Sequence, residues 1–238
     1  MMKLAVQLYS VRDHIKCGDD LLNILPKIKE LGFEGVEFAG YFGVEADVLK
    51  AKLDECGLVA VGTHMGLQDY LPVNINKTAE YVKTLGLMYA GVGGAPHDTC
   101  AESTKTAKIL GKAAEKLGIP TYYHNHTEEF KVFRNGKTAM QVMAEYCKLE
   151  LDTYWSFCAG VDNYDYITKN KEDIVLLHIK DGIDRKPTAL GEGNNDLAAV
   201  IKAAKDAGIE WIVLENDDPV PDGLSDIGRS MKWLKANV

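Results

Sequence analysis

One junction recurs five times along the chain: an amphipathic helical segment ends at a glycine and runs directly into an apolar, β-rich segment. The copies read KIKELGFEGVEF, KLDECGLVAVGTH, YVKTLGLMYAGVG, AAEKLGIPTYYHNH and AAKDAGIEWIVLEN. Glycine suits the position just after a helix, where a left-handed backbone carries no Cβ penalty. The segments that follow are apolar on both faces, as the strands of a buried parallel sheet are. Five copies of this junction predict a chain of repeated αβ units.

Eight such units account for the whole length. The predicted strands are 3–10, 34–39, 59–64, 87–93, 120–126, 149–153, 174–180 and 211–216. The predicted helices are 19–30, 44–56, 75–85, 101–117, 136–147, 163–170, 195–206 and 224–236. Dividing the 238 residues among eight units gives about 30 residues per unit, which is the size of a barrel repeat. We therefore predict one (β/α)8 TIM-barrel domain over residues 1–238, with an open doubly wound sheet as the lesser alternative.

Composition narrows the class of protein. With 46% hydrophobic and 26% charged residues the chain is typical of globular proteins. A net charge of -8 without any basic run argues against nucleic-acid binding. The five cysteines are irregularly spaced, the N-terminus lacks a signal-peptide core, and no run approaches about 20 apolar residues. We expect a cytoplasmic protein with reduced thiols and no membrane partner.

Imidazoles and carboxylates gather where predicted strands end. The residues at these ends or just beyond are Glu37, His64, His97, His124, His126, Asp152, His178, Asp181 and Glu215. One such residue alone is more often a helix cap or a loop hydrogen-bonder. A barrel, however, brings all strand ends to one mouth, where its chemistry sits. In HNH, His124 and His126 share one face of a strand, and Asn125 on the other face is expected to hydrogen-bond within the structure.

Two histidines, an aspartate and a glutamate suit a borderline divalent ion better than calcium. We therefore expect a metal site built from His124, Asp152, His178 and Glu215. The cofactor is a divalent ion of Mn, Co, Zn, Fe or Mg, and the sequence does not distinguish among them. The cysteines offer no thiolate pattern and are expected to be inert.

Seven stretches in chain order resemble the sugar phosphate isomerase/epimerase family of xylose-isomerase-like barrels, which includes ketose 3-epimerases and inosose isomerases and dehydratases. They are QLYSVR (7–12), GFEGVEFAG (32–40), YYHNHTEEF (122–130), LDTYW (151–155), LLHIKD (176–181), GEGNND (191–196) and IVLEND (212–217). The resemblance implies a divalent metal held by Glu, Asp, His and Glu from strands five to eight. Asp152, His178 and Glu215 match the last three positions. The first position departs from this pattern, because His124 stands where the family has Glu. Glu128 and Glu129 follow just beyond, so the fourth ligand is His124 or Glu129.

This departure bears on the reaction that the resemblance implies. Ketose 3-epimerases use two metal-bound glutamates as an acid/base pair around an enediolate, and here only Glu215 matches one of them. The second group is then His124, His126, Glu129 or Lys180, unless one base shuttles the proton between adjacent carbons. Lys180 is expected to stabilise an oxyanion, or else to pair with Asp181.

The resulting expectation is a metal-dependent isomerase or epimerase of a small sugar, keto-sugar or cyclitol, with Glu215, His124 and Lys180 as catalytic residues. The alternatives are a lyase or dehydratase on a keto-inositol or 3-keto-glycoside, and a non-catalytic sugar-binding barrel. An endonuclease is disfavoured by the acidic chain. The expected substrate contacts are Tyr9, Glu37, His64, His126, Glu129, Trp155 and Glu192. The partner is a small carbohydrate, and the short loops are compatible with a homo-oligomer that completes the mouth.

Overall fold

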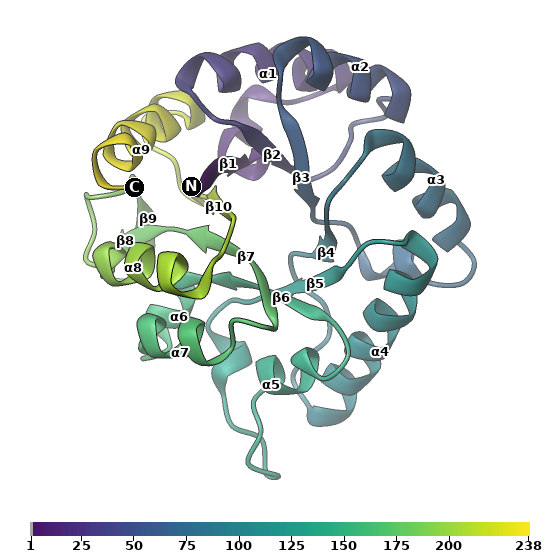
Figure 1. The fold of residues 1–238 in the computed structure, drawn as a ribbon, viewed down its shortest axis with the longest axis vertical. Helices are drawn as coiled ribbons and strands as arrows, with labels where there is room; N and C mark the ends of the chain where they lie inside the picture. Colours follow the sequence, from purple (N-terminus) through teal and green to yellow (C-terminus); the bar gives the residue numbers. More distant parts are fainter. Residues whose placement is uncertain (1) are drawn as a thin grey trace.

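The protein forms a ring of eight parallel strands surrounded by helices, seen along the barrel in Figure 1. The structure is a computed structural model that describes residues 2–238. The barrel strands are β1 (Lys3–Gln7), β2 (Gly35–Phe38), β3 (Val59–Thr63), β4 (Ala90–Val92), β5 (Thr121–His124), β6 (Lys148–Asp152), β7 (Ile174–Ile179) and β10 (Trp211–Leu214). Their order around the sheet is β3-β2-β1-β10-β7-β6-β5-β4. The predicted eight-stranded barrel is confirmed.

The helices between these strands follow the predicted alternation. They are α1 (Gly18–Leu31), α2 (Ala46–Cys56), α3 (Ile75–Leu85), α4 (Cys100–Leu117), α5 (Ala139–Ala144), α6 (Thr153–Cys158), α7 (Asn163–Lys169), α8 (Leu197–Ala207) and α9 (Gly223–Asn237). All five junction glycines follow helices with positive φ, as the repeated motif predicts. The repeat therefore marks true helix ends.

Two local predictions were wrong. The first strand ends at Gln7 rather than at residue 10, because the Gln7 side chain accepts the Tyr9 N–H and starts a 3-10 helix, η1 (Leu8–His14). The helix predicted over 136–147 is shortened to α5, because residues 131–138 form a projecting turn that a bridge between Val132 and Thr138 closes.

Two elements were not predicted: α6, and a hairpin of β8 (Asp181–Ile183) and β9 (Lys186–Thr188). Two short 3-10 helices, η2 (Leu67–Tyr70) and η3 (Glu128–Phe130), also lie in the loops.

The barrel closes at the seam between β3 and β4. There the two strands meet through a single parallel bridge between His64 and Gly91. The Met65 N–H donates to the Gly91 carbonyl at 2.9 Å, and the Tyr89 N–H donates to the Val61 carbonyl at 3.1 Å. A few hydrogen bonds at this seam thus convert an open sheet into a barrel.

The barrel interior is layered along its axis. Its lower part is an apolar plug of Ala5, Val61, Tyr122, Leu176, Trp211 and Val213. Because alternate residues of a strand share a face, the next inward positions carry Gln7, Glu37, His124, Glu150, His178 and Glu215. A second, larger core lies between the sheet and the helices. The interior therefore changes from apolar to polar toward the carboxyl ends of the strands.

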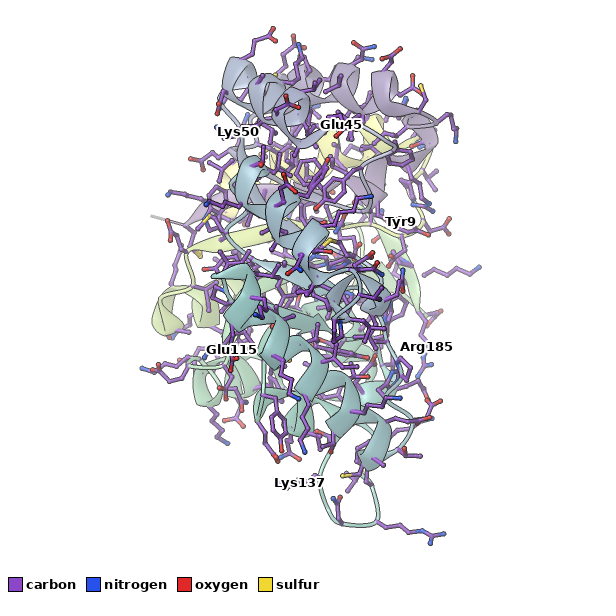
Figure 2. The ribbon with its side chains drawn as sticks, turned by 90° about the vertical axis from the view of Figure 1, so that its right-hand side faces the viewer. Tyr9, Glu45, Lys50, Glu115, Lys137 and Arg185 are labelled. Atoms are coloured by element: carbon purple, nitrogen blue, oxygen red, sulfur yellow. The ribbon has the colours of Figure 1, made fainter. Side chains whose placement is uncertain are left out.

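The loops at those ends form the mouth of the barrel. Figure 2 views the barrel from the side and places Tyr9, which follows β1, and Arg185, in the hairpin after β7, at the same end. Within residues 2–238 no helix has both the length and the apolar character needed to cross a bilayer.

Candidate active site

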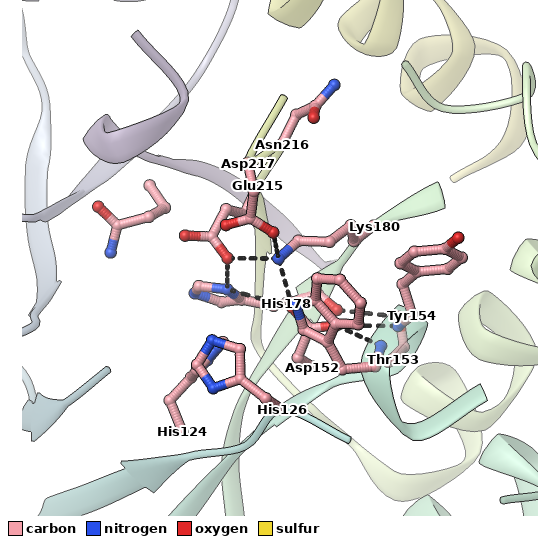
Figure 3. A network of polar contacts seen from close by, with 12 residues as sticks. His124, His126, Asp152, Thr153, Tyr154, His178, Lys180, Glu215, Asn216 and Asp217 are labelled. Carbon is pink, nitrogen blue, oxygen red and sulfur yellow. Dashed lines mark hydrogen bonds and ion pairs between the residues drawn. The ribbon is translucent and has the colours of Figure 1, made fainter. Parts of the chain in front are cut away.

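Four donor side chains meet at the mouth of the barrel, and we call them the mouth set: His124, Asp152, His178 and Glu215. One ligand atom of each lies within 4.8 Å of one ligand atom of every other. Strand register brings Asp152 opposite His178 on adjacent strands. His178 Nδ1 lies 3.0 Å from Glu215 Oε2, and Figure 3 shows this contact. These are the four metal ligands that the sequence predicts.

Asp152 serves the fold and the site with different oxygens. Its Oδ1 accepts the Tyr154 and Trp155 N–H groups at 2.9 Å each and so caps the first turn of α6. Its Oδ2 is buried and has no partner in hydrogen-bonding geometry, although Lys180 Nζ lies 2.8 Å away. The Asn125 amide holds this strand end by bonding the backbone N–H and carbonyl of Asp152. The predicted structural role of Asn125 is confirmed.

Lys180 is fully buried and reaches across the mouth set (Figure 3). Its Nζ lies 2.7 Å from Glu215 Oε2 and 2.7 Å from Asp217 Oδ2. Burial opposes the ammonium charge, but the facing carboxylates outweigh burial and hold the pKa of Lys180 well above its usual value. Lys180 is therefore a permanent cation at the mouth.

Asp181 does not pair with Lys180. Its carboxylate instead accepts four backbone N–H groups, from Gly182, Gly191, Gly193 and Asn195, at 2.9–3.0 Å. Asp181 therefore organises the GEGN loop.

A second layer of ionisable groups lies directly below the mouth set. Glu150 Oε2 lies 2.7 Å from His64 Nε2 and 3.1 Å from His124 Nδ1. Glu37 Oε2 lies 2.6 Å from His178 Nε2. Glu37 also accepts the Gln7 amide at 2.8 Å and the Tyr122 hydroxyl. The mouth set thus rests on a buried layer of carboxylates and imidazoles.

Burial and neighbouring charges shift the pKa values of the side chains in this cluster in different directions. Burial lowers the pKa of His124 to about 3, so its imidazole is neutral and free to donate a lone pair. Burial also opposes a charged His178, but Glu150, Glu215 and Glu37 outweigh it and raise the pKa of His178 well above its usual value. Burial opposes an ionised Glu215 as well, yet Lys180 and His178 hold its pKa well below the usual range.

The mouth set fits a divalent ion. It offers two imidazole nitrogens and two carboxylate oxygens, the mixture that borderline metals bind. Asp152 Oδ2, whose ion pair with Lys180 lacks hydrogen-bonding geometry, is a buried acceptor that such an ion would satisfy. In its absence, His178 and Lys180 supply the positive charge beside these carboxylates.

A cavity of about 310 Å³ opens above the set, a size suited to a small ligand. Its lining comprises Tyr9, Ala39, His64, Gly93, His124, His126, Glu215 and Asp217. Three of the predicted substrate residues, Tyr9, His64 and His126, therefore face this space. Trp155 lies beside it, with Lys180 Nζ 5.5 Å from its ring centroid.

The other three predicted substrate residues lie elsewhere. Glu37 is fully buried below the mouth set. Glu129 is buried against the Tyr123 hydroxyl at 3.2 Å and the His126 N–H at 2.9 Å. Glu192 is bonded to Arg229 on an exposed surface. Among residues 2–238, the structure therefore brings His124 rather than Glu129 to the mouth set.

Two residues of the site were not predicted: Glu150 and Asp217. Each lies two positions from a predicted ligand, Glu150 before Asp152 and Asp217 after Glu215. The same period-two spacing that pairs His124 with His126 would have found both.

Comparisons with known proteins agree on the fold. The family profile described as xylose isomerase-like TIM barrel matches residues 25–237. A search of curated proteins finds no match. A sugar phosphate isomerase/epimerase from Parabacteroides distasonis superimposes with a TM-score of 0.83 at 22% identity, covering 99% of this chain and 98% of that one.

Two further structures are similar at lower identity. An L-ribulose 3-epimerase has a TM-score of 0.78 at 16% identity, covering 100% of this chain and 94% of that one. The IOLI protein with a bound zinc atom has a TM-score of 0.77 at 16% identity, covering 100% of this chain and 98% of that one. Since the family profile spans most of the sequence, the chain belongs to the xylose isomerase-like TIM barrel family.

Proposed function

We propose that this protein is a divalent-metal-dependent isomerase or epimerase of a small sugar, keto-sugar or cyclitol. The observation that carries the proposal is the meeting of four metal donors and a buried ammonium beneath one cavity. The structural neighbours named for sugar isomerase or epimerase activity support the same class. A divalent ion bound by the mouth set would supply Lewis-acid polarisation of the substrate carbonyl.

The side chains around the cavity would transfer the proton and stabilise the charge that develops on the substrate. Glu215 is ionised and faces the cavity, so it takes the proton from the carbon beside the carbonyl. As the proton leaves, negative charge develops on the substrate oxygens to give an enediolate. Lys180 offers a fixed positive charge near that point. His126, which lines the cavity without belonging to the mouth set, would exchange the proton on the other side.

Tyr9, His64 and His126 would hold the hydroxyl groups of the substrate, and the Trp155 ring beside Lys180 would pack against the sugar. All five cysteine thiols are unpaired, which suits a reducing compartment, and we propose that the enzyme works in the cytoplasm.

Solvent deuterium exchange tests this proposal. The protein, loaded with Mn²⁺ or Co²⁺, is incubated in D2O with free ketopentoses, ketohexoses, their phosphates and keto-inositols. We expect deuterium at the carbon next to the carbonyl of one class, seen by NMR. We also expect the exchange rate to fall by about 100-fold or more in Glu215→Gln, because this variant lacks the base.

The matched control is Glu210→Gln, which alters an exposed carboxylate paired with Lys3 at the start of β10, away from the mouth, and should exchange at the wild-type rate. Conversion of a true substrate without deuterium uptake would contradict the enolising mechanism.

A dehydratase on a keto-inositol or 3-keto-glycoside is the second candidate. The observation that favours it is the three imidazoles, His64, His124 and His126, that line the cavity. Of these, His64 can give a proton to a departing hydroxyl, because Glu37 and Glu150 outweigh burial and raise its pKa. Loss of water from the product, measured by mass spectrometry, distinguishes this reaction from isomerisation.

A further inference from the structure

A second group of metal donors lies one layer deeper in the barrel than the mouth set. We call it the deep set: His64, His124, Glu150 and His178. One ligand atom of each lies within 4.8 Å of one ligand atom of every other. His124 and His178 are common to both sets, whereas His64 and Glu150 belong to the deep set alone. Glu150 precedes Asp152 by two positions on β6, so it lies farther from the mouth.

The deep carboxylates lack the cation that the mouth carboxylates have. Lys180 pairs with Asp152, Glu215 and Asp217 at 2.7–2.8 Å. Within residues 2–238, the only ion-pair partners of Glu37 and Glu150 are imidazoles. Both carboxylates are fully buried, where uncompensated charge is costly. The deep layer is therefore rich in acceptors, and the positive charge beside them is that of imidazoles such as His178, which a bound cation would replace.

One acceptor in this layer has no hydrogen-bond partner. Glu150 Oε1 is buried, and its ion-pair contact with His178 Nε2 at 3.2 Å lacks hydrogen-bonding geometry. Buried carboxylate oxygens are normally satisfied, so an orphan aimed into a cluster of imidazoles indicates a missing partner. A cation bound among the imidazoles would be that partner.

The His178 ring is placed to serve both sets. Its Nδ1 lies 3.0 Å from Glu215 Oε2 at the mouth, and its Nε2 lies 2.6 Å from Glu37 and 3.2 Å from Glu150 in the deep layer. The two nitrogens of an imidazole point in different directions, so one ring can bridge two ions once its N–H protons have passed to solvent. Binding of both ions therefore requires His178 and His124 to be fully deprotonated. The cavity at the mouth is lined by His64 and His124, which gives an ion a route to the deep set.

We propose that the deep set binds a divalent cation of its own, in addition to the ion of the mouth set. Three imidazoles and one carboxylate are the ligands of Zn²⁺ and Co²⁺, whereas Mg²⁺ prefers oxygen ligands. The deep ion neutralises Glu150 and fixes the rings of His124 and His178 from below. Because His64 and Glu150 are unique to it, the deep site can be removed without touching Asp152 or Glu215.

Metal content of purified variants tests this proposal. The protein is stripped with chelator, loaded with Zn²⁺ or Co²⁺, and its ions per chain are counted by plasma emission spectrometry. We expect about two ions in the wild type and about one in His64→Gln and in Glu150→Gln. The Co²⁺ absorption spectrum should lose the bands of the nitrogen-rich site in both variants, while Mg²⁺ should not displace that ion.

The matched control for the deep variants is Glu129→Gln, which should keep both ions because Glu129 contacts neither set. Circular dichroism checks that each variant is folded. If Glu150→Gln does not fold, His64→Gln decides the question, since the His64 side chain is 14% exposed and its loss is better tolerated. Unchanged metal content and an unchanged Co²⁺ spectrum in the folded deep variants would overturn the deep site.

Asp152→Asn separates this proposal from the proposed function. Asparagine keeps one acceptor oxygen to cap α6 but weakens the mouth set. If Asp152→Asn loses one ion but His64→Gln and Glu150→Gln lose none, the deep site is refuted and the proposed function is still supported. A loss in the deep variants but none in Asp152→Asn would support the deep site and contradict the mouth ion.

Discussion

Lys180 shows at the level of one residue how this barrel accommodates several buried acids. Its ammonium is completely enclosed and lies within ion-pair distance of Asp152, Glu215 and Asp217. A buried cation is tolerated only where its charge is matched, and here three carboxylates match it. Burial opposes an ionised Glu215, but Lys180 and His178 outweigh it and hold the pKa of Glu215 well below its usual range.

Removing this cation should destabilise the metal-free protein. For Lys180→Met we expect a loss of about 3–5 kcal/mol in the free energy of unfolding, because three carboxylates lose a buried partner. Urea unfolding in the presence of chelator measures it. Lys202→Met is the control, since the contacts of Lys202 with Asp206 and the Tyr164 hydroxyl are exposed and their loss should leave the midpoint nearly unchanged. Equal midpoints for the two variants would refute this account of Lys180.

At the scale of an element, the loop between β9 and α8 depends on one carboxylate. Asp181 Oδ1 accepts the Gly182 and Asn195 N–H groups, and Oδ2 accepts those of Gly191 and Gly193. These bonds fold the GEGN loop back against the start of the hairpin.

Asp181→Asn should loosen this loop. An amide presents one acceptor oxygen instead of two, so two of the four N–H groups lose their partner at a cost of about 1–3 kcal/mol. We expect faster amide hydrogen exchange at two of these positions and a lower midpoint of thermal unfolding. Asp196→Asn, at the N-cap of α8, should change neither, because asparagine caps helices as well as aspartate does. Unaltered exchange in Asp181→Asn would argue against a structural role for this carboxylate.

At the scale of the whole molecule, the barrel is weakest where β3 meets β4. The seam has one bridge, and Gly91 stands at it with its carbonyl accepting the Met65 N–H and the Tyr70 hydroxyl. A Cβ at Gly91 would lie 2.3 Å from the buried Tyr122 ring. The absence of a side chain at this position lets the seam close over the apolar plug.

Gly91→Ala should therefore destabilise the protein by about 3 kcal/mol, the upper range for an overpacked core. Chemical denaturation monitored by tryptophan fluorescence measures it. Gly94→Ala is the control three residues along, where a Cβ meets nothing within 4 Å and stability should be unchanged or slightly higher. A wild-type midpoint for Gly91→Ala would show that the seam tolerates a side chain.

The sequence alone determined the number and order of the barrel strands, their alternation with helices and the end of the barrel that carries the polar residues. These follow from local rules, because a glycine after a helix and an apolar run after the glycine act over neighbouring positions. His124, Asp152, His178 and Glu215 were found in this way, since each ends a strand or lies near its end. The end of the first strand was mispredicted, because its apolar run continues past the point where Gln7 turns the backbone.

Only the tertiary structure decided what lies beneath those residues. Glu37, predicted to contact substrate, lies buried against His178, a residue 141 positions away in sequence. Glu150 is joined to His64 from a strand 86 positions earlier. Such contacts depend on barrel closure and strand register, which no local pattern encodes. The sequence could therefore place donors at the mouth, whereas only the closed barrel shows that they form two layers sharing His124 and His178.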